Sequence, residues 1–217
     1  MRSQAFLAVV GLAAFSTAAS AMTITVSSGP KPPSGFSESF NSLIPTHSLT
    51  FSDYFGTWSG SGDMAEKGSS TNQYAEPLND NTVYATVFGG DTETLSLKHA
   101  ATQFGLYWGS IDAYNTLTFY NGSNPVYTLT GSGLASTKNL SDNGDAFSAS
   151  SNAYISFAKL PSFDKVTFYS SRNSFEFDNV VAGVPEASTW VMMGLGFAGL
   201  AFAGLGAKRK RETRALV

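Results

Sequence analysis

The chain has 217 residues, a formal net charge of −3 at neutral pH and no cysteine. The lack of cysteine excludes disulfides, thiolate metal sites and cysteine nucleophiles. Residues 22–183 carry seven basic and fourteen acidic side chains, because the other basic residues lie at the two ends of the chain. We therefore expect one acidic domain. Its negative charge would be repelled by phosphate backbones, so we expect no nucleic-acid partner.

The first residues have the pattern of a secretory signal peptide. Arg2 supplies a positive charge, the stretch from Ala5 to Phe15 is apolar, and Ala19-Ser20-Ala21 provides the small residues that precede cleavage. We expect residues 1–21 to be removed on export. Residues 22–35 then combine a short strand at Thr23–Ser27 with a proline-rich linker.

The C-terminal part has the pattern of a membrane anchor. An uncharged run extends from Trp190 to Ala207, and as an α-helix it would be ~27 Å long, about the thickness of the hydrocarbon core of a bilayer. The run has no polar face, unlike a surface helix of a soluble protein. Four basic residues follow it directly and resist translocation. This pattern predicts one transmembrane helix with the basic tail inside and residues 22–183 outside the cytoplasm.

The order of these C-terminal features is that of a known sorting signal. Residues 184–217 contain a Pro-Glu dipeptide, an apolar run that opens at a tryptophan, and a basic tail: Pro185, Glu186, Trp190, Lys208, Arg209, Lys210 and Arg211. This order resembles the PEP-CTERM signal of Gram-negative bacteria, although Ala187 stands where that family usually has a second proline. The resemblance implies an exosortase as partner, a transient inner-membrane precursor, and a final location at the cell surface or in the extracellular matrix.

Between the two ends, the sequence favours strands. No helical period of useful length precedes Trp190, and turn-forming residues such as Gly89-Gly90 separate short segments rich in β-branched and aromatic residues. We therefore predict an all-β domain over residues 36–183, an antiparallel β-sandwich with a jelly-roll-like layout. The sequence favours one or two strands within residues 36–54 and a loop over residues 56–81. The strands predicted after that loop are 82–88, 93–98, 104–108, 115–120, 126–130, 154–158, 163–169 and 173–181.

The alternation within these strands also predicts the core. Residues of one parity along a strand share one face of the sheet. Large apolar side chains of common parity are expected to point into a single core, and these are Phe104, Leu106, Trp108, Leu117, Phe119, Phe175 and Phe177.

A second resemblance concerns this domain. The segments 104–117, 119–122, 163–166 and 175–179 are similar to the core of one group of exosortase-dependent bacterial surface proteins, whose layout is like that of jelly-roll lectin-like modules. No biochemical activity follows from this resemblance. Our leading hypothesis is a non-enzymatic exported protein of the envelope or of an exopolysaccharide biofilm matrix. Two other functions stay open: a carbohydrate-binding, lectin-like module and a secreted glycan hydrolase.

Each of the open functions has candidate residues. Tyr107, Tyr114 and Tyr120 offer aromatic rings that could stack on sugars. A hydrolase needs paired carboxylates, and Asp112, Glu176 and Asp178 could converge in space. The histidines, His47 and His99, lie in no nucleophile elbow and in no metal-ligand pair.

The sequence predicts no organic cofactor, but it contains candidate calcium ligands. Asp142, Asn143 and Asp145 gather side-chain oxygens in one loop, and Asp178 lies near the end of the last strand. Calcium prefers such oxygen ligands, although the loop lacks the closing glutamate of a twelve-residue calcium motif.

Overall fold

The computed structural model describes residues 21–30, 38–45, 49–183, 195 and 197. The predicted signal peptide, most of the proline-rich linker, His47, the Pro185-Glu186 dipeptide and the basic tail lie outside these residues, as does nearly all of the run 190–207. Within the described residues, no helix is both long and apolar enough to cross a bilayer.

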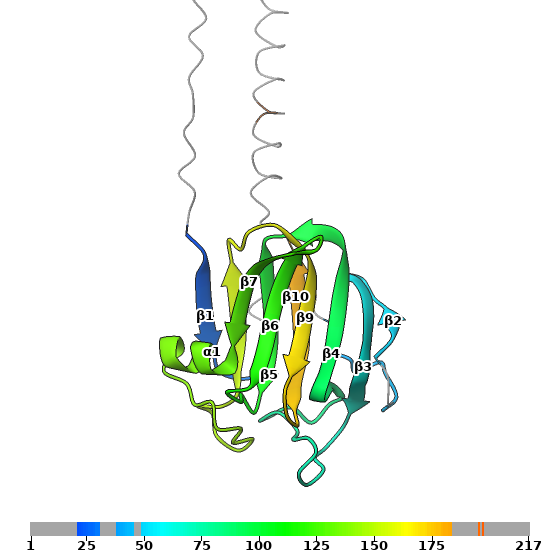
Figure 1. The fold of residues 1–217 in the computed structure, drawn as a ribbon, viewed down its shortest axis with the longest axis vertical. Coiled ribbons are helices and arrows are strands. Elements are labelled where there is room, and N and C mark those ends of the chain that lie inside the picture. The colour runs from blue at the N-terminus through cyan, green and yellow to red at the C-terminus, as the bar shows by residue number, and fades with distance from the viewer. Residues whose placement is uncertain (1–20, 31–37, 46–48, 184–194, 196, 198–217) are drawn as a thin grey trace, which may run out of the picture.

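The described domain is a curled antiparallel sheet with one short helix and long connecting loops (Figure 1). Every strand pairing in it is antiparallel, and the order along the sheet is β1-β8-β5-β10-β4-β9-β6-β7, with β3 paired to β4 and β2 to β3. The strands are β1 (Thr23–Ser27), β2 (Phe51–Ser52), β3 (Gly56–Glu66), β4 (Tyr84–Ala101), β5 (Gln103–Gly109), β6 (Asn115–Asn121), β7 (Asn124–Thr130), β8 (Ala153–Ala158), β9 (Phe163–Ser170) and β10 (Phe175–Gly183).

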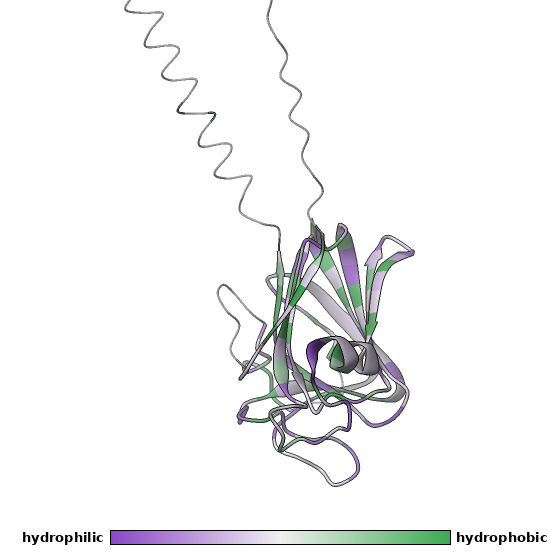
Figure 2. Cartoon of the chain, turned by 90° about the vertical axis from the view of Figure 1, so that its left-hand side faces the viewer, coloured by the Kyte–Doolittle hydropathy of each residue, from purple (hydrophilic) through white to green (hydrophobic). Residues whose placement is uncertain are grey.

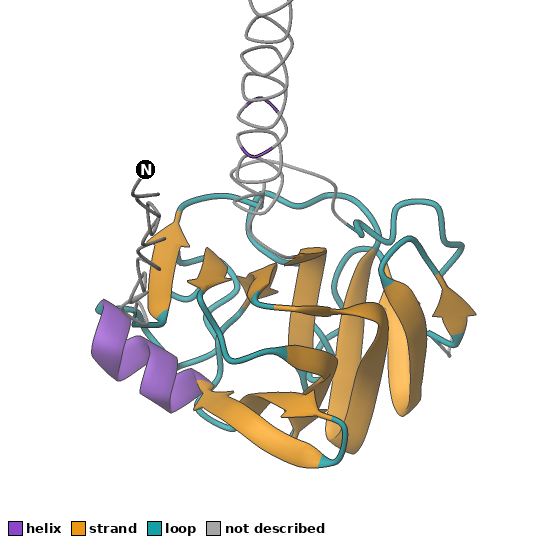
Figure 3. Cartoon of the chain, turned by 90° about the horizontal axis from the view of Figure 1, so that it is seen from above, coloured by secondary structure: helices purple, strands orange, loops and turns teal. Residues whose placement is uncertain are grey.

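The long strand β4 turns this one sheet into two layers. One edge of β4 pairs with β3, while its other edge is shared by two strands: residues 85–87 pair with β10, and residues 92–96 pair with β9. The sheet therefore forks at β4. Strands β10, β5, β8 and β1 form one layer and β9, β6 and β7 form the other, as the view from above shows (Figure 3).

Aromatic side chains fill the space between the layers. Phe104 of β5 meets Phe119 of β6 with ring centroids 5.2 Å apart, and Phe177 of β10 stacks on Phe168 of β9 at 4.1 Å. Apolar and polar segments alternate along the strands accordingly (Figure 2). All seven residues predicted from parity belong to this one core, which confirms that prediction.

Three local predictions are wrong. The first part of the predicted loop over residues 56–81 is the strand β3, which pairs along β4. Residues 82–88 and 93–98 do not form separate strands, because β4 continues through Gly89 and Gly90. These glycines permit a bend: Gly90 has φ +91°, and a Cβ on Gly89 would lie 2.9 Å from the backbone of Arg172. A helix also precedes Trp190.

That helix is α1 (Gly131–Lys138), which follows β7 directly. The Thr130 hydroxyl caps its N-terminus by accepting a hydrogen bond from the Gly133 amide, and Asn139 ends it in a left-handed conformation. A helix of two turns has too few apolar positions to show a period, and for this reason no helical pattern is visible there in the sequence.

The outer face of the β10-β5-β8 layer is covered as well. The segment 67–83 crosses this face and is fixed to it by side-chain hydrogen bonds: the Tyr107 hydroxyl donates to the Leu78 carbonyl at 2.5 Å, and the Tyr84 hydroxyl donates to the Gly68 carbonyl at 2.6 Å. We call this segment the covering loop. Because of it, polar residues on the outward face of β10 are buried.

Candidate functional site

A polar cleft of about 420 Å³ lies where the covering loop meets the end of the sandwich. Four segments line it: the covering loop, the β5–β6 connection, the segment between α1 and β8, and the start of β10. The lining residues are Ser70, Asn72, Gln73, Tyr74, Ala75, Ser110, Asp112, Tyr114, Asn143, Gly144, Asn173, Ser174 and Glu176. Because β10 starts at this cleft and runs to Gly183, the cleft and Gly183 lie at opposite ends of the domain (Figure 1).

Glu176 forms the floor of the cleft. Its carboxylate accepts hydrogen bonds from the Ser110 hydroxyl at 2.6 Å, from the Ala75 amide at 3.0 Å and from the Ser174 hydroxyl. Burial nevertheless raises the pKa of Glu176 to about 7, since desolvation outweighs these bonds and the charge of Asp112 adds to it. The covering loop is thus attached to β10 through a carboxyl group that gains a proton near neutral pH.

Asp112 lies at the side of the cleft, half-buried. Burial raises its pKa to about 6, against a lowering by hydrogen bonding with Tyr114. Gly144 packs against it so closely that a Cβ there would lie 2.4 Å from Asp112 Oδ1, and Gly144 also has φ +67°. Only glycine fits this position without strain, so the backbone can approach the carboxylate.

Tyr114 supplies the aromatic surface. Its hydroxyl donates to the Asn173 carbonyl at 2.6 Å, which ties this lining residue to the start of β10, and the guanidinium of Arg172 lies 5.9 Å from the ring centroid. Burial and the neighbouring Asp112 raise the pKa of this tyrosine, so the hydroxyl remains a donor at any physiological pH.

Asn152 holds the surrounding loops together. Its Oδ1 accepts from the Leu78 amide at 3.0 Å and from the Ser110 amide at 2.9 Å, which joins the covering loop to the end of β5. Its Nδ2 donates to the carbonyls of Asp145, Ala146 and Ser148. One buried amide therefore fixes three loops, and the cleft is formed before any ligand arrives.

The three tyrosines singled out from the sequence lie in different places. Tyr114 lines the cleft, whereas Tyr107 is 1% exposed beneath the covering loop and has no ring face to offer a ligand. Tyr120 lies on β6 outside the cleft, with the Lys165 ammonium 4.5 Å from its ring centroid. Of the three carboxylates, Asp112 and Glu176 line the same cleft, while Asp178 does not.

The candidate calcium ligands are not gathered around one point. Asn143 Oδ1 accepts from the Ser151 hydroxyl at 2.7 Å, and Asp145 Oδ1 accepts from the Phe147 amide at 3.0 Å, so both oxygens are occupied by the loop itself. Asp178 is buried on β10. In the part of the chain that the structure describes, no three histidine or acidic side chains are placed to hold a metal ion together.

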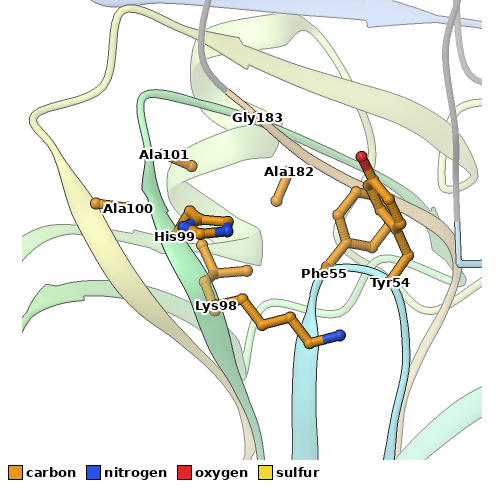
Figure 4. Close-up of a pocket in the computed structure, with 9 residues that line it drawn as sticks. Tyr54, Phe55, Lys98, His99, Ala100, Ala101, Ala182 and Gly183 are labelled. Carbon is orange, nitrogen blue, oxygen red and sulfur yellow. The ribbon is translucent and has the colours of Figure 1, made fainter.

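A second pocket, of about 470 Å³, lies at the opposite end of the domain (Figure 4). It contains His99 and is lined mainly by apolar groups from the ends of β4 and β10 and from the β2–β3 turn: Tyr54, Phe55, Leu97, Lys98, His99, Ala100, Ala101, Ala182 and Gly183. It brings no carboxylate near His99, so this histidine has no partner there for acid–base chemistry.

Sequence reasoning missed Ser110, Ser174 and Asn152, which position the carboxylates and the loops. Serine and asparagine in turn-rich segments are typical of any loop. The partners of Asn152 Oδ1 and of the Ser110 hydroxyl lie between 42 and 74 residues away in the sequence, while Ser174 bonds to Glu176 only two residues on. The covering loop itself shows no period. No local signal could have identified these residues.

The fold and the cleft define a class: an all-β protein in which a curled antiparallel sheet carries a preformed, loop-built polar cleft at one end. Neither a family model nor a curated protein matches the chain. Among solved structures, it is similar to a carbohydrate-binding module, CsCBM6-3 from Clostridium stercorarium, solved in complex with cellobiose. The identity is 11% and the TM-score 0.31, over 56% of this chain and 88% of that chain. A likeness of this size transfers neither a ligand nor a site.

Proposed function

We propose that the protein is a non-enzymatic surface or matrix protein that binds a neutral polysaccharide in the polar cleft. The observation that carries this proposal is the convergence of an aromatic ring, carboxylates and amides in one preformed cleft. Sugars present apolar C–H faces that stack on rings such as that of Tyr114, and hydroxyls that pair with carboxylates and amides. The volume of the cleft is in the range of ordinary ligand pockets, about 300–1,000 Å³.

The charges favour a neutral ligand over an acidic one. Asp112 and Glu176 line the cleft, and the lining includes no lysine or arginine. Arg172 lies beside the Tyr114 ring, but one cation does not outweigh two carboxyl groups once these are ionised. Like charges would repel an acidic polysaccharide, while the hydroxyls of a neutral sugar can donate to the Asp112 carboxylate.

The surroundings of Glu176 argue against a glycan hydrolase. A catalytic acid or nucleophile has to reach the scissile bond. The oxygens of Glu176 instead accept from Ser110, Ser174 and the covering loop, and the side chain is fully enclosed. The carboxyl pair therefore serves structure and hydrogen bonding in this proposal, and bond cleavage is not part of it.

The location belongs to the proposal as well. The signal-peptide pattern, the apolar run and the Pro185-Glu186 dipeptide support export, an inner-membrane precursor and processing by an exosortase. Extracellular polysaccharide is the ligand class that such a location would offer.

Titration of the full chain in detergent micelles with neutral and acidic oligosaccharides tests the proposal, with a glycan array to find the ligand. Replacement of Tyr114 by alanine removes the stacking surface and should weaken binding about tenfold or more. Tyr120→Ala is the matched control, since this tyrosine is also half-buried but lies outside the cleft, and its affinity should equal that of the wild type.

Two results would overturn the proposal. If no neutral glycan binds, or if Tyr114→Ala and Tyr120→Ala behave alike, the cleft is not a glycan site. Release of new reducing ends from a polysaccharide would instead show a hydrolase.

A further inference from the structure

Two buried carboxylates face each other beneath the covering loop, away from the polar cleft. Asp80 belongs to the covering loop and is 4% exposed, and Asp178 lies on β10 and is fully buried. Burial raises the pKa of Asp178 to about 10, and the next causes are the negative charge of Asp80 and hydrogen bonding between the two groups. The two carboxyl groups therefore lie close to each other.

The hydrogen bonds of this pair are incomplete. Asp80 Oδ1 accepts from the amide of Thr82 at 3.1 Å and from its hydroxyl, and Asp178 Oδ2 accepts from Asn179 Nδ2 at 3.0 Å. The other oxygens, Asp80 Oδ2 and Asp178 Oδ1, are buried and have no hydrogen-bond donor among the described residues. Ionised carboxylate oxygens can only accept, so these two groups can bond to each other only when one of them carries a proton.

Something positive has to lie between these oxygens. The nearby side chain that also acts on Asp178, Glu38, is itself negative and raises the pKa further. Two unpaired buried carboxylates would cost far more than a surface loop could offset. The choice is between a shared proton and a bound cation.

The surroundings fit a cation with oxygen ligands. The hydroxyls of Tyr107 and Tyr154 lie close enough that Asp80 raises the pKa of the first and Asp178 that of the second. Both hydroxyls donate to backbone carbonyls, of Leu78 and Asn179, so carbonyl oxygens are present as well. Calcium accepts irregular sets of carboxylate, carbonyl and water oxygens, and two carboxylates neutralise its charge.

We propose that Asp80 and Asp178 together bind a divalent cation of the calcium type, which fastens the covering loop to β10. The ion would satisfy both orphan oxygens at once. Because the same loop supplies Ser70 to Ala75 to the polar cleft, the cation would also fix one wall of that cleft. The proposal stands without any assumption about the cleft's ligand.

Thermal unfolding of the full chain in detergent micelles, in EGTA and then with increasing CaCl2, tests the cation site. Binding to the native state alone should raise Tm by about 5–10 °C at a hundredfold excess over Kd. Calorimetric titration with CaCl2 should give one ion per chain. Asp178→Asn and Asp80→Asn should each abolish the response to calcium.

The asparagine variants also make a prediction of their own. They keep the shape of the side chain and remove a negative charge, so in EGTA they should melt at a higher temperature than the wild type. Asp145→Asn, in the other acid-rich loop, is the matched control and should respond to calcium like the wild type. If one of the two asparagine variants fails to fold, the other gives the same test.

Three outcomes would overturn the proposal. The first is a wild-type Tm that does not change with calcium, which would leave a shared proton as the partner of the two oxygens. The second is a calcium response that survives in both Asp178→Asn and Asp80→Asn. The third is a response lost in Asp145→Asn, which would place the ion in the 142–145 loop.

Discussion

Replacement of Trp108 tests how the core is packed. This side chain is fully buried, and its ring stacks on Phe175 with centroids 4.6 Å apart. Its indole Nε1, however, is buried with no hydrogen-bond acceptor among the described residues. Trp108 therefore combines a large packing contribution with an unpaired donor, and two substitutions separate these effects.

Trp108→Ala removes the whole ring and should cost about 3–5 kcal/mol of unfolding free energy, as large core truncations do. Trp108→Phe keeps a ring on Phe175 and leaves a cavity of ~40 Å³, which costs about 1 kcal/mol at ~24 cal/mol per Å³, plus about 1 kcal/mol of lost transfer energy. It also removes the unpaired donor, whose burial costs about 1–3 kcal/mol. The net change for phenylalanine should be within about 1 kcal/mol of zero.

Urea unfolding followed by far-UV circular dichroism measures both changes, since this signal does not depend on the tryptophan that is replaced. Equal losses in the two variants would refute the argument, because they would show that Nε1 has an acceptor, such as a buried water. A loss below about 1 kcal/mol for Trp108→Ala would show that the ring is not part of the core.

Two further predictions concern Glu176 and the sorting signal. Burial raises the pKa of Glu176 from 4.5 to about 7, so the native state keeps a proton that the unfolded state has lost, and stability falls as pH rises through this window. Between pH 4.5 and pH 8, at fixed calcium, the unfolding free energy of the wild type should fall by roughly 3 kcal/mol more than that of Glu176→Gln. Parallel pH profiles of the unfolding free energy would contradict this. Glu186→Ala should leave the domain folded and exported but unprocessed. Mass spectrometry of the mature protein should then find that residues 208–217 are retained. If the wild type retains them as well, the apolar run is a permanent anchor.

The core residues were predictable because successive side chains of a strand point to opposite faces of the sheet. Phe104, Trp108 and Phe119 face inward in the structure as their parity requires, and a buried face needs no information from elsewhere in the chain. The all-β class followed from the same patterns. Parity does not predict burial on the other face of the sheet. Tyr107 faces outward, as its position between core residues requires, but the covering loop buries it.

The bend of β4 and the composition of the cleft were not predictable for a related reason. Gly89-Gly90 is compatible with a turn or with a bend in one strand, and only the pairing of β3 with β4 on both sides of these glycines decides between them. Asp112 and Glu176 come together because two distant loops meet, and Asn152 joins those loops through contacts that leave no local pattern. Tertiary contacts decide both cases.

The placement of the polar cleft and Gly183 at opposite ends of β10 has a mechanical consequence. A pull between a ligand held in the cleft and the chain beyond Gly183 acts along the axis of β10, which pairs with β5 on one side and with β4 on the other. Antiparallel hydrogen bonds run across the strand, so this force loads them in shear and many must break together, whereas a pull from one edge would open them one after another. If the domain linked a polysaccharide to the cell in this way, the strand that carries Glu176 would also carry the pulling force.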